Sequence, residues 1–207
     1  KVYCGYQERN QESINQLIKT IDDETIKQDI IKNEKIKFGK FDVTDEILFD
    51  NFFEKIKSEF GNVDFIVHSI AFAKKEHLRG RLVDVDKRGF DVAMDVSAFS
   101  LIKIIKKFEG ILNENGSIVA MTYEGSKKVV PNYNIMGVAK AALEAEIKYL
   151  ANDFGSSGIR VNGISSGVVG TTASKAIKGF IDIVADSIKR SPLKRLTKKD
   201  EIANTAL

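Results

Sequence analysis

The chain has 207 residues, which suits one large α/β domain and is short for two independent ones. The 32 basic and 29 acidic residues leave a net charge of +3, and no dense basic run accompanies that excess, so composition does not predict a nucleic-acid surface. The apolar share of 43% is ordinary for a globular protein and excludes disorder as the default state.

The single cysteine, Cys4, excludes an intramolecular disulfide framework and argues against a cysteine zinc site. With only His68 and His77 besides, we expect no metal site. We expect His68, inside an apolar run, to be a hydrogen-bonded core residue, and His77 to be solvated. No run approaches the roughly 18 apolar residues of a membrane span, and no signal-peptide pattern opens the chain. We therefore expect a cytoplasmic protein without membrane contact.

Short β-like runs alternate with longer helix-like segments along the chain. The expected strands are Lys1–Tyr6, Lys35–Val43, Val63–Ile70, Gly116–Tyr123 and Gly158–Ser165. Helical periodicity marks Glu46–Phe60, Lys87–Leu112 and Asn132–Phe154. The alternation predicts an α/β fold in which a doubly wound, Rossmann-like parallel sheet forms a single domain over residues 1–207.

The segment FDVTDE follows the second expected strand. It places Asp42 and Val43 at the strand end, with Thr44 as the expected N-cap of the next helix and Glu46 nearby. Further on, Met94–Ser100 reads as a packed helix segment.

The helix after Pro131 has the clearest pattern. One apolar stripe recurs at steps of three and four: Met136, Ala139, Leu143, Ile147, Leu150 and Phe154. Pro131 suits the entry turn, and Gly155 suits a left-handed position after the last turn. Near the end of the chain, Lys189–Lys199 reads as a surface loop that leads into a short final helix.

Tyr133 and Lys140 are seven residues apart on this helix, a rotation of about 700°, so their side chains share a face. The lysine leans back toward the tyrosine, and a ligand along that face could touch both. We expect its ammonium group to favour phenolate character in Tyr133. The plain alternative is a solvated lysine and a half-buried tyrosine.

The strand 158–165 ends in small residues and leads into a Gly- and Thr-rich loop. There the Thr171 hydroxyl could bond a phosphate, and backbone amides near Val169 could meet an amide group. The plain alternative is a flexible surface connection.

The stretch TYEGSKKVVPNYNIMGVAKAALEA resembles the active-site segment of the bacterial, NADH-type enoyl-acyl carrier protein reductases, a divergent branch of the short-chain dehydrogenase/reductase superfamily. In that family one tyrosine precedes the catalytic tyrosine by ten residues, and a lysine follows it by seven. Tyr123, Tyr133 and Lys140 match this pattern. The broader superfamily separates tyrosine and lysine by four positions, so the wider spacing is the distinguishing feature.

The resemblance extends over nearly the whole chain and implies where a nicotinamide cofactor binds. In VDFIVHSIAFA it implies contacts at the carboxyl end of a buried strand, and in GYQER a residue near the adenosine ribose; Asp42 and Val43 would border the adenine. The implied cofactor residues are Gln7, Asp42, Val43, Ser69, Ile70, Ala71, Lys140, Val169 and Thr171. Gln7 favours NADH, while NADPH stays open.

No glycine-rich turn precedes the first strand, although a dinucleotide fold normally begins with one. We therefore expect the first βα unit and the last strand of the family fold to be missing from these 207 residues. We also expect this fragment alone to bind the cofactor weakly.

The implied activity is reduction of a trans-2-enoyl thioester on acyl carrier protein in fatty-acid biosynthesis. In that interpretation Tyr133 donates a hydrogen bond to the enolate oxygen, Lys140 holds the nicotinamide ribose, and Tyr123 lines the acyl pocket. Residues of about 171–190 would form the substrate-binding loop and helix, although Val168 and Gly170 stand where the family usually has a proline and a basic residue.

The family also implies a homotetramer, and basic side chains could meet the acidic carrier protein: Lys189, Arg190, Lys194 and Arg195. Two alternatives stay open. One is a carbonyl or alcohol dehydrogenase of the broader superfamily, and the other is a non-catalytic truncated scaffold of the same fold.

Overall fold

The computed structural model describes residues 2–7, 12, 36–171, 174 and 177–207. The chain divides into two compact units, Lys1–Asn62 and Val63–Leu207, and each is described by itself. Within the described ranges, no helix combines the length and the apolar character needed to cross a membrane.

The first unit contains two parallel strands and a helix. They are β1 (Val2–Tyr6), β2 (Ile36–Lys40) and α3 (Glu46–Phe60). The helix buries a face of large apolar residues at helical spacing, namely Phe49, Phe52, Phe53 and Ile56. The rings of Tyr3 and Phe41 pack on Phe52, with centroids 5.3 and 4.6 Å away.

The N-cap of α3 differs from the sequence expectation. Asp45 caps the helix, because its carboxylate accepts a hydrogen bond from Leu48 N at 3.0 Å. Thr44 instead donates to Asp42 through its amide at 2.9 Å and its hydroxyl at 2.7 Å. The Asp42 carboxylate therefore closes a local turn before the helix, and the prediction of Thr44 as N-cap is wrong.

The second unit is built on a parallel sheet with the strand order β3-β4-β5 among its described residues. The strands are β3 (Val63–His68), β4 (Leu112–Thr122) and β5 (Arg160–Ser165). His68 pairs with Ala120, which in turn pairs with Gly163. The carboxyl ends of the strands thus lie side by side, as the alternating pattern predicts for a Rossmann-like sheet.

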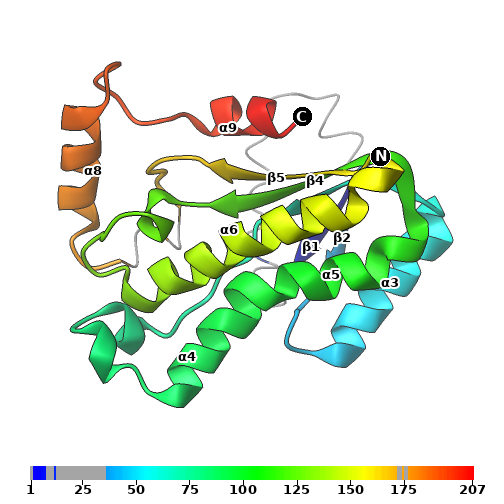
Figure 1. Cartoon of the computed structure of the whole chain (residues 1–207), viewed down its shortest axis with the longest axis horizontal. Coiled ribbons are helices and arrows are strands. Elements are labelled where there is room, and N and C mark those ends of the chain that lie inside the picture. The colour runs from blue at the N-terminus through cyan, green and yellow to red at the C-terminus, as the bar shows by residue number, and fades with distance from the viewer. Residues whose placement is uncertain (1, 8–11, 13–35, 172–173, 175–176) are drawn as a thin grey trace. The chain divides into compact units, whose positions relative to one another are not determined.

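Five α-helices of the second unit accompany the sheet within the described residues. They are α4 (Lys87–Met94), α5 (Ser100–Phe108), α6 (Asn134–Phe154), α8 (Phe180–Arg190) and α9 (Lys199–Ala206). Helix α6 packs on β4 and β5, while α8 stands at the end toward which these strands point (Figure 1). Helix α9 confirms the expected short final helix, while the connection before it is shorter than predicted, since Lys189 and Arg190 belong to α8 and Lys199 begins α9.

The predicted stripe on α6 is confirmed. Five of its six residues are at most 8% exposed, and Phe154 is half-buried. Leu143, Ile147 and Leu150 meet the completely buried Ile118 of β4 in one apolar cluster. This cluster fixes α6 on the sheet, and with it the residues that α6 carries to the strand ends.

The end of α6 and the course of the preceding helices differ from expectation. Gly155 is right-handed, with φ −61°, because a 3-10 turn over Gly155–Ser157 continues the helix; Gly158 takes the left-handed position at φ 69°. The expected helix Lys87–Leu112 is interrupted by a π-helical turn over Asp95–Phe99. That turn buries Val96, Ser97 and Ala98, which bears out the packed segment there.

Candidate active site

Two tyrosines that are ten residues apart in the sequence lie in contact. Tyr123 directly follows β4, and Tyr133 directly precedes α6. Their ring centroids are 5.2 Å apart and the ring planes meet at 74°, an edge-to-face arrangement. The structure therefore brings together two of the three residues that the sequence nominates as catalytic.

Tyr133 stands between two asparagines with left-handed backbone angles. Asn132 has φ 61° and Asn134 has φ 21°, values that are uncommon outside glycine. The Asn132 side-chain amide donates to Lys178 O at 2.9 Å. The Asn134 amide donates to Gly80 O, also at 2.9 Å. Backbone strain of this kind persists where surrounding contacts hold it, and it concentrates at functional sites.

The Tyr133 ring packs directly on Gly125, in the short turn after β4. A Cβ atom on Gly125 would lie 2.5 Å from Tyr133 Cδ1, which is closer than atoms can approach. A Cβ atom on Gly137 of α6 would lie 2.8 Å from Gly125 O. The absence of side chains at these two positions allows the turn to lie against the start of α6.

Lys140, the third predicted catalytic residue, is buried, with 5% of its surface exposed. Its ammonium group donates to Met121 O near the carboxyl end of β4, at 2.7 Å. Burial lowers the pKa of Lys140 to about 8, since the interior disfavours the charged form. The prediction that Lys140 is more than a solvated surface lysine is consistent with this position.

The phenol of Tyr133 does not have the electrostatic character that the spacing predicts. Burial, followed by the neighbouring Tyr123, raises the pKa of Tyr133 above its ordinary value. The expectation that Lys140 would favour the phenolate is therefore wrong for this structure. Tyr133 keeps its proton at neutral pH and can act as a hydrogen-bond donor.

Glu144 holds this site together and was missed in the sequence. Its Oε1 accepts hydrogen bonds from Thr122 Oγ1 at 2.9 Å and from Ser126 Oγ at 2.6 Å. One carboxylate of α6 thus fixes both the end of β4 and the turn after Tyr123. Its position four residues after Lys140 puts it on the same helix face, but that spacing alone does not distinguish it from a solvated glutamate.

The structure confirms the predicted environment of one histidine and contradicts that of the other. His68 is 1% exposed and its Nε2 lies 2.7 Å from Ser100 Oγ, which confirms a hydrogen-bonded core residue. Burial, and then the charge of Lys140, lowers the pKa of His68 to about 4. The expectation of a solvated His77 is wrong. Only 9% of His77 is exposed, because Gly89 leaves room for its ring.

The predicted cofactor residues of the second unit lie beyond the strand ends. Ser69 and Ala71 are exposed and Ile70 is half-buried, directly after β3. Such small, accessible residues at the carboxyl edge of a parallel sheet fit the close approach of a dinucleotide. The Thr171 hydroxyl is engaged locally, since it donates to Ser174 Oγ at 3.1 Å. Val169 O in turn accepts from Ser174 Oγ at 2.6 Å.

The predicted cofactor residues of the first unit are described separately. Gln7 Nε2 donates to Asp42 Oδ2 at 2.9 Å, so the structure brings these two residues together. Val43 is buried, with 8% exposure. Of the GYQER motif, Glu8 and Arg9 lie outside the described residues.

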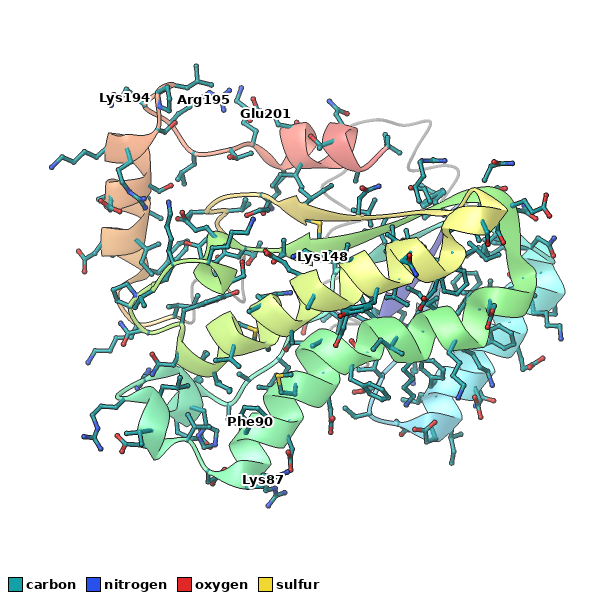
Figure 2. The ribbon with its side chains drawn as sticks, viewed as in Figure 1. Lys87, Phe90, Lys148, Lys194, Arg195 and Glu201 are labelled. Carbon is teal, nitrogen blue, oxygen red and sulfur yellow. The ribbon has the colours of Figure 1, made fainter. Side chains whose placement is uncertain are left out.

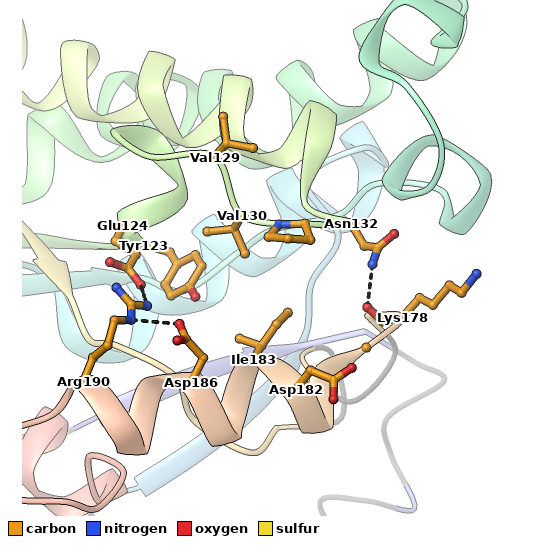
Figure 3. A pocket seen from close by; sticks show the side chains of 12 residues that line it. Tyr123, Glu124, Val129, Val130, Asn132, Lys178, Asp182, Ile183, Asp186 and Arg190 are labelled. Atoms are coloured by element: carbon orange, nitrogen blue, oxygen red, sulfur yellow. Dashed lines mark hydrogen bonds and ion pairs between the residues drawn. The ribbon is translucent and has the colours of Figure 1, made fainter.

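A cavity of about 370 Å³ separates the segment after β4 from helix α8 (Figure 3). Its apolar lining includes Tyr123, Val130, Pro131 and Ile183, and its charged lining includes Glu124, Asp186 and Arg190. Tyr123 extends into this space, whereas Tyr133 and Lys140 are not part of the lining. The cavity therefore adjoins the tyrosine pair on the side of Tyr123.

The basic residues expected to meet a partner are partly engaged within the chain. Arg190 pairs with Asp186 at 2.8 Å and with Glu124 at 3.5 Å. Arg195 pairs with Glu201 at 2.6 Å, in the turn before α9 (Figure 2). The hydrogen bond from Arg195 is the main cause that lowers the pKa of Glu201 to about 2. Lys189 and Lys194 are exposed, and the Lys194 ammonium donates to Lys189 O at 2.7 Å.

Known proteins with similar sequences identify the family of this chain. The family described as "Enoyl-(Acyl carrier protein) reductase" matches residues 2–207. The NADH-type enoyl-(acyl-carrier-protein) reductase FabI of Rickettsia conorii is 45% identical over 169 residues, which are 82% of this chain and 65% of that protein. The FabI of Bacillus subtilis is 40% identical over 204 residues, 99% of this chain and 74% of that protein.

Solved structures show the same fold. The enoyl-(acyl-carrier-protein) reductase of Anaplasma phagocytophilum, determined in complex with NAD, has a TM-score of 0.86 and 39% identity, covering all of this chain and 74% of its own. The NADH enzyme of Aquifex aeolicus has a TM-score of 0.85 and 32% identity, covering all of this chain and 77% of its own. The chain spans about two thirds of the length of the first relatives. It belongs to the enoyl-(acyl carrier protein) reductase family, as the Tyr123, Tyr133 and Lys140 spacing predicts.

Proposed function

We propose that the protein is an NADH-dependent enoyl-acyl carrier protein reductase of fatty-acid biosynthesis. The observation that carries the proposal is the arrangement of three residues. A protonated, half-buried Tyr133 packs on Tyr123 at 5.2 Å, and the helix that follows buries the Lys140 ammonium at the end of β4. The family's activity and this arrangement agree.

The tyrosine supplies the polar group that this reaction needs. When bound, the nicotinamide supplies the hydride that reduces the β-carbon of the enoyl thioester. Negative charge then develops on the thioester oxygen. The Tyr133 hydroxyl would donate a hydrogen bond to that oxygen, placing a fixed dipole where charge appears in the transition state. Its raised pKa suits this role, since the donor must keep its proton.

The remaining residues bind and position. Lys140 would hold the ribose hydroxyls of the nicotinamide half, and Tyr123 would line the acyl pocket with its ring. Residues proposed to contact the rest of the cofactor are Gln7, Asp42, Val43, Ser69, Ile70, Ala71, Val169 and Thr171. NADH is favoured over NADPH by Gln7 and by the cofactor in the relatives' names.

We further propose that the two units belong to one Rossmann-like domain, in which residues of about 171–190 form the substrate-binding loop and helix. The cavity between α8 and the Tyr123–Asn132 segment supports the substrate-binding role of α8, because it is accessible and partly apolar. The acidic carrier protein would meet lysines of this region, such as Lys189 and Lys194, since Arg190 and Arg195 already pair with carboxylates.

A homotetramer in the cytoplasm completes the proposal. Exposed aromatic side chains on the outer helices support an assembly: Phe90 is 41%, Phe99 51% and Tyr149 74% exposed. Phe90 and Lys87 lie on α4 at the edge of the molecule seen in Figure 2. Sedimentation analysis of the natural protein tests the assembly.

Substrate comparison tests the activity. The natural protein is supplied with NADH and either a crotonyl thioester or a 3-ketoacyl thioester, and loss of nicotinamide absorbance is followed. We expect oxidation with the crotonyl thioester. Oxidation with the keto substrate alone would instead identify a carbonyl reductase of the broader superfamily. Absence of saturable NADH binding would identify a non-catalytic scaffold.

A further inference from the structure

The helical run Lys87–Ile111 contains a π-helical turn that has no role in the reaction described above. The turn covers Asp95–Phe99, between α4 and α5. Its central residues are among the most deeply buried of the described chain, since Ser97 and Ala98 are 0% exposed. Turns of this kind interrupt α-helices mostly as single insertions and frequently at functional sites.

Ser97 uses its one hydroxyl to hold both backbone groups of Phe72. Its Oγ accepts a hydrogen bond from Phe72 N at 2.9 Å and donates one to Phe72 O at 3.0 Å. A buried serine that satisfies the amide and the carbonyl of one distant residue fixes that residue's position and peptide orientation. Removing the hydroxyl would leave both groups without that partner.

Ser100, one turn later on the same side of the helix, holds His68. Ser100 Oγ donates to Val96 O at 2.8 Å and lies 2.7 Å from His68 Nε2. The Ser100 hydroxyl joins the Val96 carbonyl and the His68 imidazole. The last residue of β3 is thus tied to the same helix.

These two contacts bracket a three-residue segment. His68 precedes Ser69, and Phe72 follows Ala71. The intervening residues extend beyond the sheet edge with Ser69 and Ala71 exposed. Both ends of the segment are therefore held by serines three residues apart, one of which lies in the π-helical turn.

We propose that the π-helical turn is a positioning device for nicotinamide dinucleotide binding, with Ser97 as its positioning residue. Through its two hydrogen bonds to the Phe72 backbone, Ser97 fixes the backbone conformation of residues 69–71, against which the cofactor would bind. The inference rests on the proposed function, because it requires the cofactor to occupy the carboxyl edge of β3. A purely structural serine would contribute to folding and leave cofactor affinity unchanged.

The test measures equilibrium binding of NADH to the natural protein by nicotinamide fluorescence. Ser97→Ala is expected to raise the Kd for NADH about tenfold, because both hydrogen bonds from Ser97 to the Phe72 backbone are lost. The amide of Phe72 should lose hydrogen-exchange protection in the same variant. The KM for a crotonyl thioester, measured at saturating NADH, should stay within about twofold of the original because the acyl pocket is not touched.

A matched variant separates positioning from general damage. Val96 lies in the same turn and is 7% exposed, and Val96→Ala leaves a small cavity while keeping the Ser97 hydroxyl that bonds Phe72. It should lower stability and leave the Kd for NADH unchanged. Ser97→Cys keeps a weak donor and acceptor of similar size and should recover part of the affinity.

The outcomes distinguish the two claims. An unaltered natural protein that binds no NADH would overturn the proposed function and this role together. If the unaltered protein binds NADH and Ser97→Ala binds it equally well, the positioning role alone is overturned. If Ser97→Ala does not fold, Ser97→Cys is compared with Val96→Ala, and equal affinities of the two would overturn the role.

Discussion

The two sides of the cavity beside Tyr123 differ in how the chain holds them. On one side, the turn after β4 is tied to α6 by Glu144 and by the packing of Tyr133 on Gly125. On the other side, α8 has no buried residue. Arg190 of α8 pairs with Glu124 on the opposite side, and the Asn132 side-chain amide donates to Lys178 O, two residues before α8.

The difference follows the chemistry that each side is proposed to perform. The part-buried hydrogen bonds of Glu144 are less screened by water than surface contacts, so they fix the turn after Tyr123 closely. An exposed ion pair contributes little and is screened by salt, so it lets a helix adjust to what binds. The rigid side thus carries the tyrosines, and the adjustable side is the one proposed to meet the acyl chain.

The largest effect is expected at Lys140, on the rigid side. Lys140→Met should reduce kcat/KM roughly 1,000-fold, because the nicotinamide half of the cofactor would lose the group proposed to hold it in position. The same change should stabilise the fold, because a charged ammonium no longer has to be buried. We expect the free energy of unfolding at pH 7 to rise by about 1–3 kcal/mol, measured by urea denaturation.

The stability gain of Lys140→Met should depend on pH. The pKa of Lys140 falls from 10.5 in the unfolded chain to about 8 in the folded one. Between these values the unfolded state binds more protons, so the stability of the unaltered protein rises with pH. The advantage of Lys140→Met should be full below pH 8 and shrink toward pH 10.5. A constant advantage over this window would show that burial of the charge is not its cause.

The second effect tests the contact between Gly125 and Tyr133. Gly125→Ala places a methyl group 2.5 Å from Tyr133 Cδ1, so the ring must move. A displacement of the hydrogen-bond donor by about 1 Å should lower kcat roughly 10- to 100-fold, with a smaller change in KM. Steady-state kinetics with a crotonyl thioester measures both.

Gly155→Ala is the matched control. Gly155 has an ordinary helical φ of −61°, and a Cβ atom there meets nothing within 4 Å. It should leave kcat unchanged and stabilise the protein by about 0.4–1 kcal/mol. Equal losses of activity in the two variants would contradict a specific role for the Gly125 contact.

The sequence predicted the elements of the site but not the hydrogen bonds that connect them. The apolar stripe on α6 and the spacing of Tyr133 and Lys140 are periodic, so they can be read without knowing the fold. Glu144 cannot, because a glutamate on an amphipathic helix is normally solvated. Its role depends on Thr122 and Ser126, which only the strand-to-turn geometry brings within reach.

Local rules also failed where tertiary contacts decide. Gly155 has the residue type of a left-handed cap, yet the chain continues helically to Gly158. His77 is polar and lies in a charged segment, but Gly89 leaves space for its ring in the interior. The π-helical turn has no sequence signal of its own, because Val96, Ser97 and Ala98 fit an α-helix equally well.

A third, smaller effect is expected at Glu144. Glu144→Ala removes the acceptor of two hydroxyl groups and should cost about 1–3 kcal/mol of stability, with kcat lowered about tenfold as the Tyr123 turn loosens. Glu144→Gln keeps one acceptor oxygen of the same shape and should lie close to the unaltered protein. Thermal unfolding and kinetics of the pair measure this, and equal defects in both would mean that the negative charge rather than the acceptor geometry matters.

The smallest effect is expected on the adjustable side. Arg190→Gln removes the pairing with Glu124 that connects α8 to the turn after Tyr123. We expect the KM for a crotonyl thioester to rise about threefold, with kcat and the unfolding midpoint unchanged, since an exposed pair affects the position of α8 more than the fold. Added salt should produce the same shift in the unaltered protein and little in the variant. Arg81→Gln, which breaks an exposed pair with Asp84 outside the cavity lining, is the control and should change neither constant. A fall in kcat of the same size as the rise in KM would show that this side, too, holds the reacting groups, and the contrast between the two sides would not stand.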